Sequence, residues 1–261
     1  MGTWVLDLDG VVWRGDELIP GADLAVERLI AAGHQVVACT NHAHAPSSKR
    51  AMLDQLGVAP FPVVTAAEAA ATRCDADDRV LVLGDRSLVE LLVSMGLEAI
   101  DVHDLPDGET PANVDVVVVG ATHRWDRSRV GMVADAVRSG ARFVATNDDP
   151  TFPTAGSLGP RLLPGNGALV AAVATAAGVQ PEVAGKPFPA TASLIEERYG
   201  PVDVVVGDRT DTDGGLAVAL GAAFGLVLSG VTTLADAPFV PAPTWLADDL
   251  ASLVAAAISL A

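Results

Sequence analysis

The chain has 261 residues, half of them hydrophobic and 19% charged, with a formal net charge of −17. This length fits one large or two modest domains, and the apolar content supports a sizeable core and argues against intrinsic disorder. The negative balance disfavours a nucleic-acid partner, because phosphate backbones bind cationic surfaces.

The first predicted element is an apolar strand that ends in Asp7-Leu8-Asp9-Gly10. Side chains alternate along a strand, so Asp7 and Asp9 leave the backbone on the same side. Two carboxylates held this close repel each other, and their burial is costly unless a cation or hydrogen-bond donors offset the charge. The pattern therefore indicates a site for a hard metal ion. The alternative is a surface strand end whose aspartates cap the next loop.

Helices and strands then alternate along the chain up to residue 78. Helices are predicted over 21–32, 46–56 and 65–74, and a short apolar strand over 35–39. Thr65 and Glu68 form a capping-box signal at the start of the third helix. This alternation favours a parallel sheet covered by helices on both faces.

The acidic stretch 75–78 is interpreted as a linker, after which the alternation resumes. Strands are predicted over 79–83, 114–119, 142–145, 202–206 and 222–228, and helices over 86–95, 126–139, 166–177, 190–199 and from 245 onward. Residues 146–167 hold four prolines and are predicted to form a long irregular loop. Loops of that length inside compact domains are usually functional.

Four segments end in polar groups that could meet at one edge of such a sheet. They are Asp7 with Asp9, Thr40 with Asn41, Lys186 after a short apolar stretch, and the run from Asp208 to Asp213. In open parallel sheets, ligands bind beyond the carboxyl ends of the strands. Oxygen ligands favour Mg²⁺ over zinc or copper, and the lysine and the hydroxyl would then hold a phosphoryl group.

These segments, in this order, resemble the haloacid dehalogenase superfamily of phosphohydrolases. Its signature is an aspartate-x-aspartate strand end, a Thr or Ser strand end, a lysine, and a Gly-Asp strand end with a later aspartate. The neighbours of these motifs are similar to one branch, which holds the para-nitrophenyl phosphatases, pyridoxal phosphate phosphatases and glycerol 3-phosphate phosphatases. The segments that carry this likeness are Asp9-Gly10-Val11-Val12-Trp13, Gly185-Lys186-Pro187, Gly207-Asp208-Arg209 and Pro164-Gly165-Asn166-Gly167.

The resemblance implies a role for each motif residue. Asp7 would be the nucleophile that forms an aspartyl-phosphate, and Asp9 the general acid and base. Mg²⁺ would be held by Asp7, the backbone carbonyl of Asp9 and Asp208, while Asp213 would orient a metal-bound water or Lys186. The groups expected to bind the phosphoryl oxygens are Thr40, the Asn41 N–H and Lys186.

The resemblance also implies the fold: an α/β protein with a doubly wound parallel-sheet core and an inserted α/β cap domain. The core is expected to comprise residues 1–78 and 181–261, and the cap residues 79–180. Within the loop at 146–167, the candidate substrate-binding residues are Asn147, Phe152 and Arg161. His42 and His44 are interpreted as further substrate-side groups, with a metal-binding pair as the alternative.

The sequence thus predicts a Mg²⁺-dependent phosphatase for a small soluble phosphate ester. One rival is a receiver-type signalling domain, which also gathers acidic residues, Thr and Lys around Mg²⁺. Two others are a carbon–halogen or carbon–phosphorus hydrolase of the same superfamily and a catalytically silent metabolite-binding protein. The sequence leaves the physiological substrate open, and also the oligomeric state, for which a homodimer is one option.

Cys39 and Cys74 show neither a disulfide framework nor a metal-binding spacing, which fits a reducing compartment. The start of the chain lacks the pattern of a signal peptide, and no uninterrupted apolar run reaches membrane-spanning length. We therefore expect a soluble cytoplasmic protein without a membrane partner.

Overall fold

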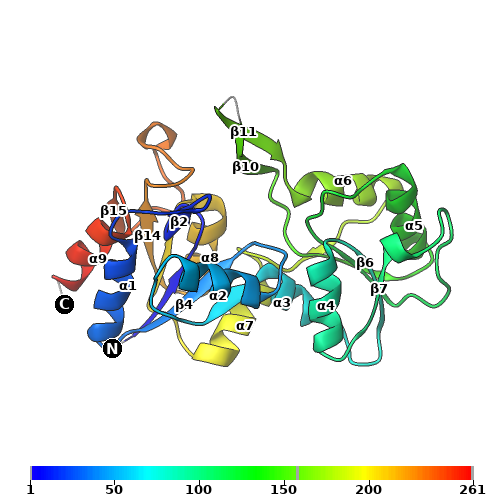
Figure 1. Cartoon of the computed structure of the whole chain (residues 1–261), viewed down its shortest axis with the longest axis horizontal. Coiled ribbons are helices and arrows are strands. Elements are labelled where there is room, and N and C mark those ends of the chain that lie inside the picture. Colours follow the sequence, from blue (N-terminus) through cyan, green and yellow to red (C-terminus); the bar gives the residue numbers. More distant parts are fainter. Residues whose placement is uncertain (1, 157–158, 260–261) are drawn as a thin grey trace. The chain divides into compact units, whose positions relative to one another are not determined.

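The chain folds into two compact units, each with its own parallel sheet (Figure 1). The computed structural model describes residues 2–156 and 159–259, and of 152–156 and 159–161 it describes only the backbone. The first unit comprises Met1–Thr40, Pro46–Val64 and Lys186–Ala261, and the second Asn41–Ala45 and Thr65–Gly185.

This division differs from the predicted boundaries at both ends of the inserted region. Residues 65–78 and 181–185, expected in the core, belong to the second unit, as do residues 41–45. The reason is their pairing: β12 (Glu182–Val183) adds a parallel strand to β9 (Arg142–Ala145) of the second unit. Likewise α3 (Ala66–Ala71) packs against α4 (Arg86–Ser94).

The sheet of the first unit has six strands, in the order β15-β14-β13-β1-β4-β5. Their bounds are β1 (Thr3–Leu6), β4 (Gln35–Thr40), β5 (Val63–Thr65), β13 (Val204–Gly207), β14 (Ala223–Val227) and β15 (Trp245–Ala247). From β1 the chain adds strands on one side through β4 and β5, and later on the other side through β13, β14 and β15. The strand order therefore reverses at β1, where open sheets of this kind bind their ligands.

One face of this sheet builds a core with three helices. Trp4, Leu6, Val36 and Val206 point into it, and the helices contribute apolar residues such as Leu29, Leu53 and Leu253. Figure 1 shows two of these helices, α1 and α9, side by side, and they are in contact. The bounds are α1 (Ala22–Ala31), α2 (Pro46–Gln55), α7 (Pro189–Tyr199), α8 (Gly215–Ala219) and α9 (Leu250–Ile258), with a small hairpin of β2 (Trp13–Arg14) and β3 (Glu17–Leu18).

The second unit contains a five-stranded parallel sheet in the order β12-β9-β8-β6-β7. The remaining bounds are β6 (Arg79–Leu83), β7 (Glu98–Asp101), β8 (Val116–Val119), α5 (Arg127–Arg138) and α6 (Asn166–Ala177). All four valines of β8 are buried, as expected of a central strand with helices on its faces. Helices α5 and α6 pack against each other over the core of this unit.

The prediction of an irregular segment over 146–167 was wrong. Strands β10 (Thr151–Gly156) and β11 (Gly159–Pro164) form an antiparallel hairpin there, with Phe152 opposite Leu163. The prolines misled the prediction, because proline is excluded from central strands but tolerated where a strand has a free edge. A two-stranded ribbon has a free edge on each strand.

Two smaller differences concern element ends, and a third concerns strands that were not predicted. The last helix begins at Leu250 rather than at 245, after the short strand β15 and an N-cap at Asp249. Helix α3 has the predicted capping box of Thr65 and Glu68 but ends at Ala71. Strands β5 and β7 were not predicted. Among residues 2–156 and 159–259, no helix combines the length and the apolar character needed to cross a membrane.

Candidate active site

The central strand β1 leads directly into the two aspartates of the first loop. The backbone N–H of Asp7 donates to the Val206 carbonyl on β13 at 2.8 Å, so Asp7 is fixed at the carboxyl end of the central strand. The chain then turns over Leu8, whose carbonyl accepts from the N–H of Trp13 at 3.1 Å. Gly10 lies in this turn at φ 83°, a conformation that favours glycine.

Lys186 joins this loop to two other parts of the first unit. Its Nζ lies 2.7 Å from Asp7 Oδ1, 2.7 Å from Asp213 Oδ1 and 2.8 Å from the backbone carbonyl of Cys39 at the end of β4. The side chain is only 3% exposed. Burial lowers the pKa of this ammonium, but the charges of Asp213 and Asp7 outweigh burial, so the pKa lies well above its usual value. Lys186 is therefore a fixed cation.

Three carboxylates gather around this ammonium. Asp7, Asp208 and Asp213 each offer an oxygen within 4.8 Å of the others, and all three are buried. Burial raises the pKa of Asp208 to about 7, helped by the charge of Asp213 and opposed by the Val231 N–H that donates to it. Burial also holds the pKa of Asp7 well above its usual range, against the charge of Lys186. If all three carboxyls were ionised, the cluster would therefore carry more negative charge than one lysine offsets.

This cluster fits a hard divalent cation. Its ligands are all oxygen atoms, which Mg²⁺ prefers. The backbone also leaves room for the carboxylate of Asp208: a Cβ on Gly10 would lie 2.6 Å from its Oδ2, and one on Gly230 would overlap it. Asp213 is differently placed, because its two oxygens accept from Lys186 and from the Arg209 N–H. Asp7 and Asp208 are therefore the better candidate ligands.

Asp9 is held by Trp13 and Lys49, neither of which was predicted as a site residue. Its Oδ1 accepts a hydrogen bond from the indole Nε1 of Trp13 at 2.9 Å, and its Oδ2 lies 3.7 Å from Lys49 Nζ. The same ammonium lies 5.4 Å from the centre of the Trp13 ring. A signal was present in the sequence, because Pro46, Lys49 and Leu53 share one helical stripe and all three are buried.

The Thr-Asn motif at the end of β4 is divided between the two units. Thr40 is buried in the first unit, next to the Cys39 carbonyl that Lys186 contacts. Asn41 belongs to the second unit. There its side-chain Nδ2 donates to Asp149 at 3.2 Å, and its backbone carbonyl accepts from Asn147 Nδ2 at 2.7 Å. Two predicted binding residues, Asn41 and Asn147, are thus in direct contact.

The two predicted histidines also lie together in the second unit. The rings of His42 and His44 are 4.7 Å apart, and His44 Nδ1 lies 2.7 Å from Ser87 Oγ at the start of α4. No cluster of metal-ligating side chains among the described residues includes either of them. The remaining candidates, Phe152 and Arg161, have side chains outside the described part of the structure.

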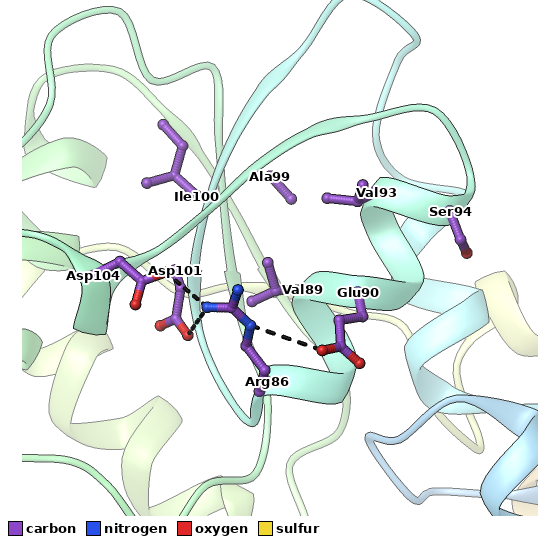
Figure 2. A pocket seen from close by; sticks show the side chains of 9 residues that line it. All are labelled: Arg86, Val89, Glu90, Val93, Ser94, Ala99, Ile100, Asp101 and Asp104. Atoms are coloured by element: carbon purple, nitrogen blue, oxygen red, sulfur yellow. Dashed lines mark hydrogen bonds and ion pairs between the residues drawn. The ribbon is translucent and has the colours of Figure 1, made fainter.

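The second unit also has an open depression between α4 and β7, shown in Figure 2. Its floor is apolar, and Arg86 lies across it, 2.7 Å from Asp104, 3.7 Å from buried Asp101 and 3.8 Å from Glu90. These carboxylates already engage the guanidinium. The depression shares no residue with the acidic cluster.

Comparison with known proteins places this geometry in a family. A model described as haloacid dehalogenase-like hydrolase matches residues 4–98, and one described as HAD-hydrolase-like matches residues 183–253. The chain is 37% identical over 264 residues to a D-glycerol 3-phosphate phosphatase of Mycobacterium tuberculosis, covering 95% of this chain and 70% of that protein. It is 30% identical to an acid sugar phosphatase of Staphylococcus haemolyticus, covering 88% of this chain and 86% of the relative.

Similarity to a solved structure supports the same family. A glycerol phosphate phosphatase from Mycobacterium tuberculosis, solved in complex with magnesium, superposes with a TM-score of 0.82 at 35% identity. The match covers 97% of this chain and 76% of that one. The chain therefore belongs to the haloacid dehalogenase-like hydrolases, in the branch of phosphoric monoester hydrolases that contains these relatives.

Proposed function

We propose that this chain is a Mg²⁺-dependent phosphatase that hydrolyses small phosphate monoesters through an aspartyl-phosphate on Asp7. The observation that carries the proposal is the position of Lys186, which bridges Asp7 and Asp213 at 2.7 Å each inside a group of three buried carboxylates. A fixed ammonium beside a carboxylate at the end of the central strand suits the capture of a phosphoryl group.

Asp7 is the proposed nucleophile. Lys186 holds its Oδ1, and Oδ2 would attack phosphorus in line, forming a new P–O bond as the bond to the leaving alkoxide breaks. Thr40 and Lys186 would bind the equatorial oxygens of the phosphoryl group. Bound Mg²⁺, held by Asp7, Asp208 and the Asp9 carbonyl, would supply positive charge against the carboxylates and the phosphoryl oxygens.

Asp9 is the proposed acid and base. In the first half-reaction it would give a proton to the departing alkoxide. In the second, it would take a proton from the water that attacks the aspartyl-phosphate, so that inorganic phosphate leaves and Asp7 returns as a carboxylate. The contacts of Asp9 with Trp13 and Lys49 support this role because they fix the direction of its carboxylate.

We propose small polyol and sugar phosphates as the substrate class. The support comes from the relatives, one named for D-glycerol 3-phosphate and one for acid sugar phosphates. Substrate contacts by Asn41, His42, His44, Asn147, Phe152 and Arg161 stay predictions. So do the role of the second unit as a cap, a homodimer and a cytoplasmic location.

Membership in a hydrolase family removes the receiver-domain rival. Among hydrolase chemistries, the second aspartate of the first loop favours phosphate esters, because their alkoxide leaving groups need a proton.

The test is hydrolysis of a phosphate-ester panel (glycerol, sugar, nucleotide, pyridoxal and para-nitrophenyl phosphates) with Mg²⁺ and with EDTA. Wild type should release phosphate only with the metal, and Asp7→Asn should lose turnover while keeping its tryptophan fluorescence spectrum. Mass spectrometry of acid-quenched wild type should find one added phosphoryl group, on the peptide that contains Asp7. Turnover by Asp7→Asn, or the label on another residue, would refute the nucleophile assignment.

A further inference from the structure

The chain has two lysines, and each of them lies against a different aspartate of the first loop. Lys186 contacts Asp7, within the proposed metal site. Lys49 contacts Asp9, from helix α2, and is only 8% exposed. A lysine on the buried stripe of a helix is unusual, because removing an ammonium from water is costly unless other groups offset the charge.

Among the described residues, the ion pair and the ring contact of Lys49 both lead to the same carboxylate. Its Nζ lies 3.7 Å from Asp9 Oδ2 and 5.4 Å from the centre of the Trp13 ring, whose Nε1 donates to Asp9 Oδ1 at 2.9 Å. The two oxygens of Asp9 thus face two different groups, an ammonium and an indole N–H. The face of the same indole also attracts the ammonium.

This support matters because the Asp9 side chain is 48% exposed. A half-exposed aspartate has several rotamers open to it, and water can solvate each of them. Packing alone does not choose among these rotamers, whereas two directional partners do. Trp13 is fully buried and Lys49 is 8% exposed, so both are far less exposed than the carboxylate that they contact.

We propose that Lys49 is a positioning residue, which together with Trp13 holds the Asp9 carboxylate in the orientation needed for proton transfer. The inference rests on the proposed function, in which Asp9 protonates the leaving group. Lys49 touches neither the substrate nor the metal in this scheme. Its effect would therefore depend on how much the leaving group needs a proton.

The test compares leaving groups in the first turnover. Para-nitrophenolate leaves without a proton, whereas an alkoxide needs one, and a general acid is worth about 10²–10⁴ in rate. With Lys49→Met we expect release of the alcohol from an alkyl phosphate to slow at least tenfold, with KM within about twofold, since only part of that contribution is lost. The para-nitrophenol burst should stay within about twofold of wild type. Lys49→Arg should recover most of the alkyl rate.

Arg50→Met is the matched control, because it removes one positive charge from the neighbouring, exposed position of the same helix. It should leave both rates unchanged. Trp13→Phe, which removes the indole N–H and keeps an aromatic ring, is the second variant and should show the same dependence on leaving group as Lys49→Met.

The outcomes separate the two proposals. Equal slowing of both leaving groups by Lys49→Met, or no difference from Arg50→Met, would overturn the positioning role while leaving Asp9 as the acid. Alcohol release at the wild-type rate by Asp9→Asn would instead overturn the proposed function on which the inference rests.

Discussion

Replacing Asp208 with asparagine should stabilise the metal-free protein at pH 8 while removing its response to Mg²⁺. Asp208 is 2% exposed, and burial with the nearby charge of Asp213 raises its pKa from 3.8 to about 7. The folded state therefore keeps a proton that the unfolded state has already lost between about pH 4 and pH 7. The free energy of unfolding falls as pH rises through this window, and the loss is complete above it.

The size of the pKa shift of Asp208 determines how much Asp208→Asn should raise the free energy of unfolding. Roughly 3 pKa units correspond to about 4 kcal/mol at pH 8, which is an upper bound because solvent and side-chain relaxation relieve part of the cost. Asparagine stays neutral, and its amide oxygen can still accept from the Val231 N–H. At pH 5 the wild-type carboxyl is protonated, so Asp208→Asn should change the stability little.

The free energy of unfolding can be measured by urea titration followed by tryptophan fluorescence, since Trp4, Trp13 and Trp245 all lie in the first unit. Titrations at pH 5 and pH 8, with EDTA or with Mg²⁺, give the four conditions needed. Saturating Mg²⁺, at about 100 times its Kd, should add about 2.7 kcal/mol to wild type and nothing to Asp208→Asn.

Asp211→Asn is the control for this comparison. Burial raises the pKa of Asp211, but its hydrogen bonds and the charge of Arg209 outweigh burial and hold the pKa below its usual value. Asp211→Asn should therefore stabilise the protein at neither pH. If Asp208→Asn lowers the metal-free stability at pH 8, or shifts it equally at both pH values, the charge argument is wrong.

Three further outcomes follow from the same site. In the absence of metal, Lys186→Met should lower the free energy of unfolding by about 3–5 kcal/mol at pH 8, since it leaves Asp7 and Asp213 buried without their cation. The same urea titrations should show a smaller loss at pH 5, where Asp7 is protonated. Calorimetric titration of Mg²⁺ should give an affinity about tenfold weaker at pH 6 than at pH 8, because Asp208 must release its proton, and a flat profile would contradict this. Asp9→Asn should form the phospho-enzyme from para-nitrophenyl phosphate but hydrolyse it about 10²–10⁴-fold more slowly, so intact-mass measurements should show it accumulating.

The parts of the structure that local pattern controls could be predicted from the sequence. The apolar run before Asp7 forms the central strand, and the Thr65–Glu68 pair forms the expected capping box. Lys186 and Asp208 could be identified from their motifs, and the structure brings both of them together with Asp7.

What could not be predicted depends on contacts distant in the chain. The β10–β11 hairpin is stabilised by pairing across prolines, which argue locally against a strand. Strand β15 has only three residues and forms because Trp245 to Ala247 lie beside β14. Lys49 shares a helical stripe with Pro46 and Leu53, but nothing in that stripe indicates Asp9 as its partner until the fold brings α2 against the first loop.

The central place of β1 in its sheet has a consequence for how the protein is made. One neighbour of β1, β4, follows within the first 40 residues, whereas the other, β13, is synthesised only after the whole second unit. Lys186 stands 179 positions beyond Asp7, so on the ribosome the nascent first unit exposes an unpaired strand edge and an acidic loop without its ammonium. The newly made chain is therefore most open to aggregation before it can bind a metal, and it closes only as its last third emerges.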